Sequence, residues 1–97
     1  MIYEFFYEDR VDDDIDSALD YYFSINPNLV EDFLYRLDEA MRKILNSPKG
    51  FETKFKGIKT ILLEQFPYHL YYIIDEKKII ILALLNAHSG PEKIDEI

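Results

Sequence analysis

The sequence predicts an α+β fold with the element order β-α-α-β-β-β, in which a helical hairpin packs on one face of a small, mainly antiparallel sheet. Two consecutive stretches carry apolar residues at helical spacing, one aromatic strand-like segment precedes them, and three strand-like segments follow. A sheet with one apolar face must be covered, and the helix pair is the only cover that the chain offers. With 97 residues, 48% of them hydrophobic, the chain is expected to form a single domain over 1–97.

The N-terminal half predicts one strand and two helices. Residues 2–7 (Ile-Tyr-Glu-Phe-Phe-Tyr) have the aromatic content of a strand. The acidic run 12–14 marks the start of a helix over 12–24, because carboxylates cap free N–H groups and meet the positive end of the helix dipole. Asn26-Pro27-Asn28 ends that helix and begins a second one, which continues to residue 46. Helices joined this tightly form an antiparallel hairpin.

The C-terminal half predicts a basic loop followed by three strands. Residues 49–57 are the loop, with two glycines, and the strands are expected at 58–66, 69–75 and 78–87. The strand at 58–66 is then an exposed edge of the sheet, which could pair with a strand of a partner or with a second copy of the chain.

The tight turn between the last two strands fixes an expected register. If Glu76 and Lys77 are the turn residues, Asp75 lies opposite Lys78. Because side chains alternate along a strand, this register predicts an apolar face toward the helices, made of Leu70, Tyr72, Ile74, Ile79, Ile81, Ala83, Leu85 and Ala87. The opposite, less apolar face then carries His69, Tyr71, Ile73, Ile80, Leu82, Leu84, Asn86 and His88.

Charge is distributed unevenly along the chain. The net charge is −8, which as a whole argues against a nucleic-acid-binding surface. The first 39 residues carry −10, residues 40–63 carry +5, and the remainder carries −3. The middle third can therefore present a basic patch to RNA or to an acidic partner.

Composition excludes several kinds of site. The absence of cysteine rules out disulfides, thiolate zinc sites and cysteine nucleophiles. No apolar run approaches the ~20 residues of a membrane-spanning helix, and Glu4 and Glu8 interrupt any signal-peptide pattern. We therefore expect a cytoplasmic protein without membrane contact, metal or cofactor. The acidic run beginning at Asp12 lacks the glycine and the distal glutamate of a calcium loop, so it is interpreted as a helix start.

Four groups of residues resemble the RelE/ParE superfamily of toxins from type II toxin–antitoxin modules, in the branch called plasmid-stabilisation proteins. The resemblance covers about residues 2–92, and its most specific part combines Phe-Pro-Tyr-x-Leu-Tyr-Tyr at 66–72 with a histidine that ends the last strand. The residues that carry it are Asp14, Ile15, Ala18, Tyr21 and Tyr22 on the first helix, Phe33 and Leu37 on the second, the segment 58–72, and the segment 81–88 with Pro91.

The resemblance implies a fold, a partner and a choice of targets. The first strand would lie beside the last, and both helices would cover one face of the sheet. A cognate antitoxin would neutralise the protein. RelE-like members cut mRNA on the ribosome, whereas ParE-like members poison DNA gyrase without being nucleases. The alternative function left open is a non-catalytic interaction module, a decayed or repurposed toxin fold that keeps its antitoxin-binding surface. Formation of a homodimer is also left open.

Cleavage of RNA requires a base for the ribose 2′-OH, cations on the phosphate and an acid for the leaving oxygen. The resemblance matches the catalytic positions to His88, His69 and Lys59, and the RNA or target contacts to Lys54 and Lys56. The chain departs from the family after His88, where Ser89-Gly90 stands in place of the usual arginine or tyrosine. That departure and the acidic net charge make the ParE-like action the favoured prediction.

Overall fold

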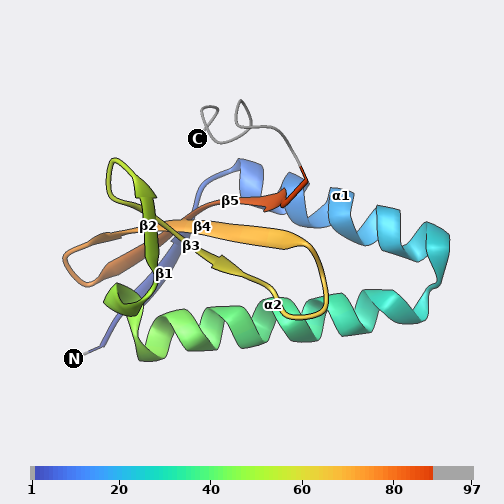
Figure 1. Cartoon of the computed structure of the whole chain (residues 1–97), viewed down its shortest axis with the longest axis horizontal. Helices are drawn as coiled ribbons and strands as arrows, with labels where there is room; N and C mark the ends of the chain where they lie inside the picture. The colour runs from blue at the N-terminus through green and yellow to red at the C-terminus, as the bar shows by residue number, and fades with distance from the viewer. Residues whose placement is uncertain (1, 89–97) are drawn as a thin grey trace.

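The computed structural model describes residues 2–88, which form two α-helices, a short 3-10 turn and five strands (Figure 1). In chain order these are β1 (Glu4–Tyr7), α1 (Arg10–Ile25), α2 (Asn28–Asn46), η1 (Pro48–Gly50), β2 (Glu52–Phe55), β3 (Ile58–Leu62), β4 (Tyr68–Asp75) and β5 (Lys78–Asn86). The predicted α+β class and the helical hairpin are confirmed. Neither helix in the described part is long and apolar enough to cross a membrane.

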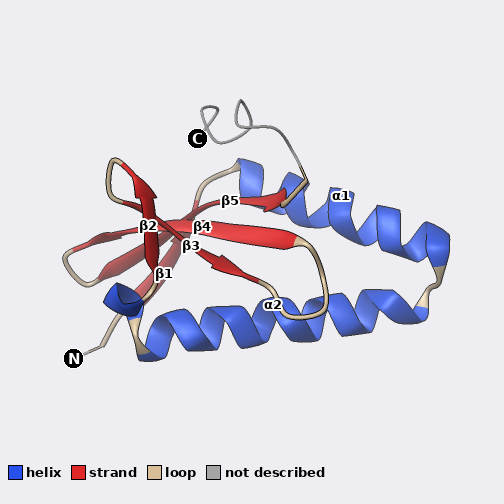
Figure 2. Ribbon diagram, viewed as in Figure 1, coloured by secondary structure: helices blue, strands red, loops and turns tan. Residues whose placement is uncertain are grey.

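The five strands form one sheet in the order β1-β5-β4-β3-β2. β1 runs parallel to β5, so the first strand lies beside the last, as the resemblance implied. The other three pairings are antiparallel. Figure 2 shows α1 above and α2 below, with α2 running back beneath the strands at an angle to α1.

The core lies between the helices and one face of the sheet. Both helices contribute side chains at helical spacing, and β3, β4 and β5 contribute alternate residues. Tyr22, Phe33, Phe66 and Tyr68 form an aromatic cluster at its centre, with Phe33 fully buried. The hairpin therefore stays on the sheet through apolar contact.

The acidic run has a different role from the one predicted. The helix α1 begins at Arg10, and no side chain forms a capping hydrogen bond at its start. Asp12 and Asp13 lie in the first turn, where they still meet the positive end of the dipole. Asp14 instead reaches the sheet, because its Oδ2 accepts a hydrogen bond from the backbone N–H of Leu84 at 3.0 Å.

The predicted loop at 49–57 was wrong in its second half, which forms strand β2. Lys56 and Gly57 both have positive φ, at 50° and 78°, the conformation that closes a tight two-residue hairpin with a matching twist. Phe51 packs against the core, and Phe55 packs on the opposite face of the sheet. As a result β3 is paired on both sides, and the expected exposed edge at 58–66 does not exist.

The predicted register of the last hairpin is correct from the turn to the pair Tyr72–Ile81 and wrong beyond it. Asp75 lies opposite Lys78 and Tyr72 opposite Ile81, but Tyr71 lies opposite Ala83, because β5 bulges by one residue. The bulge reverses the faces beyond it. Leu84 therefore faces the helices, whereas Ala83 and Leu85, which were assigned to that face, pack with Tyr71 on the other one.

Candidate functional site

The histidine on β4 lies on the face of the sheet that the helices leave uncovered, here called the open face. The side chain of His69 is half-buried there. Its Nδ1 lies 3.1 Å from Oγ1 of Thr60 on the neighbouring strand β3. The ring of Tyr71, two residues along β4, is centred 5.8 Å from the imidazole. A threonine hydroxyl and a tyrosine ring therefore hold the imidazole in one orientation.

The surroundings of His69 favour its neutral form. Burial lowers the pKa of His69 below 6.5, and the nearby Lys54 ammonium lowers it further. The Glu52 carboxylate acts in the opposite direction but has the smallest effect of the three. At neutral pH the side chain is thus an uncharged imidazole, the form that can accept a proton.

This lowered pKa predicts a pH dependence of stability. Because the unfolded chain binds a proton at His69 at higher pH than the folded chain does, the contribution is complete above pH 6.5 and decreases as the pH falls through the lowered pKa. We expect His69→Gln to lose less free energy of unfolding than the wild type between pH 7 and pH 5. Urea titrations of both proteins across this range measure the difference, and parallel pH profiles would contradict it.

Two of the predicted contact residues lie on the β2–β3 hairpin beside this histidine. Lys54 occupies the irregular position of β2, and its Nζ lies 3.5 Å from Oε2 of Glu52. Lys56 is exposed in the turn that follows. The hairpin thus brings one ammonium group into the electrostatic environment of His69, although that ammonium is shared with a carboxylate.

The ammonium of Lys59 points to the other side of the sheet. Lys59 lies opposite the core residue Tyr72, so it shares the helix-covered face and not the face of His69. Its Nζ donates hydrogen bonds to the carbonyl oxygens of Lys49 and Phe51 and to Oγ1 of Thr53, at 3.1–3.4 Å. These bonds hold the chain around η1 against the sheet. The structure therefore does not bring Lys59 together with either histidine.

His88 lies in an exposed turn after β5. Its backbone N–H donates to Oδ1 of Asn86 at 2.7 Å, and the preceding Ala87 N–H donates to the carbonyl of Pro67. This places the turn near the start of β4. Within residues 2–88 no hydrogen bond joins its imidazole to that of His69. The segment Ser89-Gly90, on which the departure from the family pattern rests, lies outside the described residues.

Of the two groups that orient His69, the sequence analysis placed Tyr71 on the same face but missed Thr60. Thr60 is the one buried polar residue in the part of the chain that the structure describes, and its partner is the histidine. Alternation along 58–66 puts Thr60 on one face of its own strand, and only the β3–β4 register shows that this is the face of His69 and Tyr71. Glu52 was not predictable in this way, because it belongs to the strand that the sequence analysis treated as a loop.

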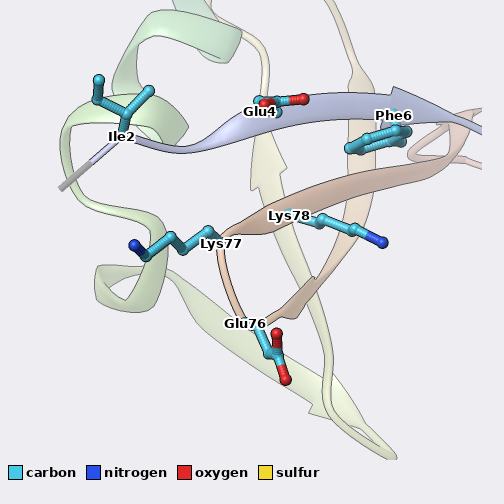
Figure 3. Close-up of a pocket in the computed structure, with 6 residues that line it drawn as sticks. All are labelled: Ile2, Glu4, Phe6, Glu76, Lys77 and Lys78. Atoms are coloured by element: carbon cyan, nitrogen blue, oxygen red, sulfur yellow. The ribbon is translucent and has the colours of Figure 1, made fainter.

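The described residues around His69 form no metal centre. No group of three or more potential ligands lies together within residues 2–88. A separate hollow of about 580 Å³ lies at the far corner of the sheet, where β1 meets the β4–β5 turn (Figure 3). It is lined by Ile2, Glu4, Phe6, Glu76, Lys77 and Lys78. This hollow shares no residue with the surface around His69.

Comparison with known proteins gives the chain a family. No protein-family model matches it. Toxin ParE2 of Mycobacterium tuberculosis (strain CDC 1551 / Oshkosh) is 31% identical over 87 residues, which cover 88% of this chain and 82% of that protein. The fold matches the structure of the chromosomal ParDE TA system from P. aeruginosa, with a TM-score of 0.78, 19% identity, and coverage of 90% of this chain and 98% of that one.

A second solved structure shares the fold at lower similarity. The isolated E. coli RelE toxin has a TM-score of 0.55 and 18% identity, with coverage of 97% of this chain and 94% of that one. The helical hairpin on a five-stranded mixed sheet is thus the architecture of a RelE/ParE-type toxin. The identity to Toxin ParE2 along most of both chains completes the assignment: the protein belongs to the RelE/ParE superfamily of toxins.

Proposed function

We propose that this chain is the toxin of a type II toxin–antitoxin module, that it inhibits growth in the ParE-like way, by acting on DNA gyrase, and that a cognate antitoxin neutralises it. The observation that carries the proposal is the 31% identity to a protein named Toxin ParE2, over 88% of this chain. The fold shared with a ParDE system supports the expectation of an antitoxin partner.

The chemistry of the open face favours a ParE-like over a RelE-like action. Cleavage of mRNA needs cations on the scissile phosphate as well as a base and an acid. Here His69 supplies one neutral imidazole, but the Lys54 ammonium that acts on it lies 3.5 Å from the carboxylate of Glu52. Lys59 is committed to backbone and hydroxyl oxygens on the opposite face. Among the described residues, the cation that acts on this proton acceptor is thus shared with a carboxylate.

The neutral imidazole keeps ribosome-dependent mRNA cleavage as a second candidate. A half-buried histidine oriented by Thr60 is a suitable base for a ribose hydroxyl, provided that the ribosome supplies the missing cations. In that case the loss of the imidazole should abolish activity, whereas a ParE-like action does not require it to transfer a proton.

Two assays with purified protein separate the candidates. We expect inhibition of gyrase supercoiling of relaxed plasmid DNA, and intact mRNA in a ribosome-bound cleavage assay. His69→Gln is the test variant and Lys77→Gln, at the exposed β4–β5 turn of the same sheet, is the matched control. Cleavage of mRNA that is lost in His69→Gln and kept in Lys77→Gln would overturn the gyrase proposal in favour of a nuclease. Failure of both assays with folded protein would leave the binding-only alternative.

A further inference from the structure

The two edges of the sheet differ in how they are protected against pairing with another chain. β2 forms one edge and carries an irregularity between Thr53 and Phe55, with Lys54 at that position. Bulges and lysines are the usual devices that prevent edge-to-edge pairing. β1 forms the other edge, pairs regularly with β5 at all four residues, and contains neither a lysine nor a proline. Both edge strands are short and carry a glutamate, but β1 lacks the irregularity and the lysine of β2, so β1 is the less protected edge.

The backbone groups of β1 that face outward are known from its pairing. The N–H groups of Glu4 and Glu8 donate to carbonyl oxygens of Lys77 and Ile81, so the even-numbered residues are bonded toward β5. The N–H and C=O groups of Phe5 and Tyr7 therefore point away from the sheet. Apolar side chains line the same edge, with 82% of Ile2, 42% of Phe6 and 51% of Tyr7 exposed.

We propose that β1 is a self-association edge, at which a second copy of this chain pairs antiparallel across a two-fold axis with Phe5 opposite Phe5 of the other copy. The proposal does not depend on the toxin activity. The two sheets would become continuous through the new β1–β1 pair, and the protected edge, β2, would remain at both ends.

The charges at this edge favour a second copy of the chain as the partner of β1, and they favour one register of the strand pair. With Phe5 opposite Phe5, Glu4 lies opposite Phe6 of the other copy, in the closer non-hydrogen-bonded type of pair. The Nζ of Lys78 lies 5.5 Å from the centre of the Phe6 ring (Figure 3), so in this register each glutamate would approach the ammonium of the other copy. Glu4 and Lys78 are register partners within one chain, yet among residues 2–88 no salt bridge joins them to each other or to another residue.

The neighbouring registers are disfavoured by the same charges. A shift of one hydrogen-bonding step in one direction places Glu4 opposite Glu8 of the other copy, twice per dimer. A shift in the other direction places Glu4 opposite itself. Like charges directly opposite each other destabilise a strand pair. The favoured register instead aligns Tyr3 with Tyr7 on the helix side of the edge, where the ring of Tyr7 already stacks on Phe5 at 6.4 Å.

The short length of β1 sets the expected strength. A strand of four residues with a few exposed side chains gives an interface at the small end of specific contacts, so the dimer should be weak and concentration-dependent. Sedimentation equilibrium on the full chain, from low micromolar to near-millimolar protein, should show a monomer–dimer equilibrium. A monomer at every concentration would overturn the proposal.

Charge reversal tests the interface itself. Glu4→Lys and Lys78→Glu should each raise the dimer dissociation constant, by about tenfold, because two attractive contacts become repulsive. The double variant should restore dimerisation by exchanging the two charges. Glu76→Lys, which makes the same charge change in the same hollow away from the edge, is the matched control and should not weaken the dimer. A dimer that is indifferent to these changes would place the contact elsewhere.

Amide exchange followed by NMR identifies the pairing atoms and the occupant. At low concentration the amides of Phe5 and Tyr7 should exchange faster than those of Glu4 and Glu8, and they should become protected as the concentration rises. If Phe5 and Tyr7 stay unprotected at high concentration, β1 is not the edge that pairs. If only an added antitoxin protects them, a foreign strand occupies the edge and the self-association proposal is wrong.

Discussion

Replacing Phe33 with alanine should lower the free energy of unfolding by about 3–5 kcal/mol, a large share of the stability of a small domain. Phe33 is fully buried, and its ring lies 5.6 Å from Tyr22, 5.0 Å from Phe66 and 5.2 Å from Tyr68, measured between centroids. The substitution removes apolar area and leaves a void where both helices meet the sheet. Chemical denaturation followed by circular dichroism measures the loss.

The control for this substitution is an aromatic residue on the same helix that the core does not use. Tyr35 is 63% exposed, and its ring contacts the guanidinium of Arg36. Tyr35→Ala should change the free energy of unfolding by no more than about 0.5 kcal/mol. Equal losses in the two variants would show that the hairpin is not anchored through the aromatic cluster.

Replacing Asp14 with alanine should cost about 1–3 kcal/mol, far more than an ordinary surface carboxylate. The strand β1 ends at Tyr7, and the N–H of Glu8 donates to the carbonyl oxygen of Ile81. Beyond Ile81, β5 has no strand neighbour on that side among residues 2–88. Asp14 supplies the acceptor for the N–H of Leu84 in that place. Its carboxylate also pairs with Arg10 at 3.1 Å.

Two further variants separate the hydrogen bond from the charge. Asp14→Asn keeps an oxygen acceptor for Leu84 and loses the ion pair, so it should be less destabilising than Asp14→Ala. Asp13→Ala removes an exposed carboxylate one residue earlier and should have little effect. The three proteins can be compared by urea denaturation at pH 7. An Asp14→Ala variant as stable as Asp13→Ala would contradict the bridging role.

The elements that the sequence predicted correctly are those with long, regular apolar patterns. The two helices follow a period of 3.6 residues, and the last two strands follow a period of two around the Glu76-Lys77 turn. The local residue pattern was sufficient to predict these elements because it agrees with the fold as a whole. The strand β2 was missed because its four residues carry no apolar alternation, and only the positive φ of Lys56 and Gly57 closes its hairpin.

The register error and the incomplete site have a common cause in tertiary structure. A one-residue bulge near Leu82 leaves no clear mark in a run of aliphatic residues, yet it reverses every face beyond it. Likewise, the five predicted site residues are all polar, and the sequence alone does not distinguish their roles. Only contacts between neighbouring strands do so. These contacts orient His69 through Thr60 and turn Lys59 toward the carbonyls near η1.

The central claim is that the chain is an active toxin, and growth after tightly controlled induction in a bacterial host tests it most directly. We predict arrest with the wild type, relief when the cognate antitoxin is expressed together with it, and weaker arrest with Phe33→Ala, whose core is destabilised. Arrest that persists in His69→Gln would agree with a ParE-like action. Normal growth with wild-type protein shown to be soluble and folded would contradict the claim.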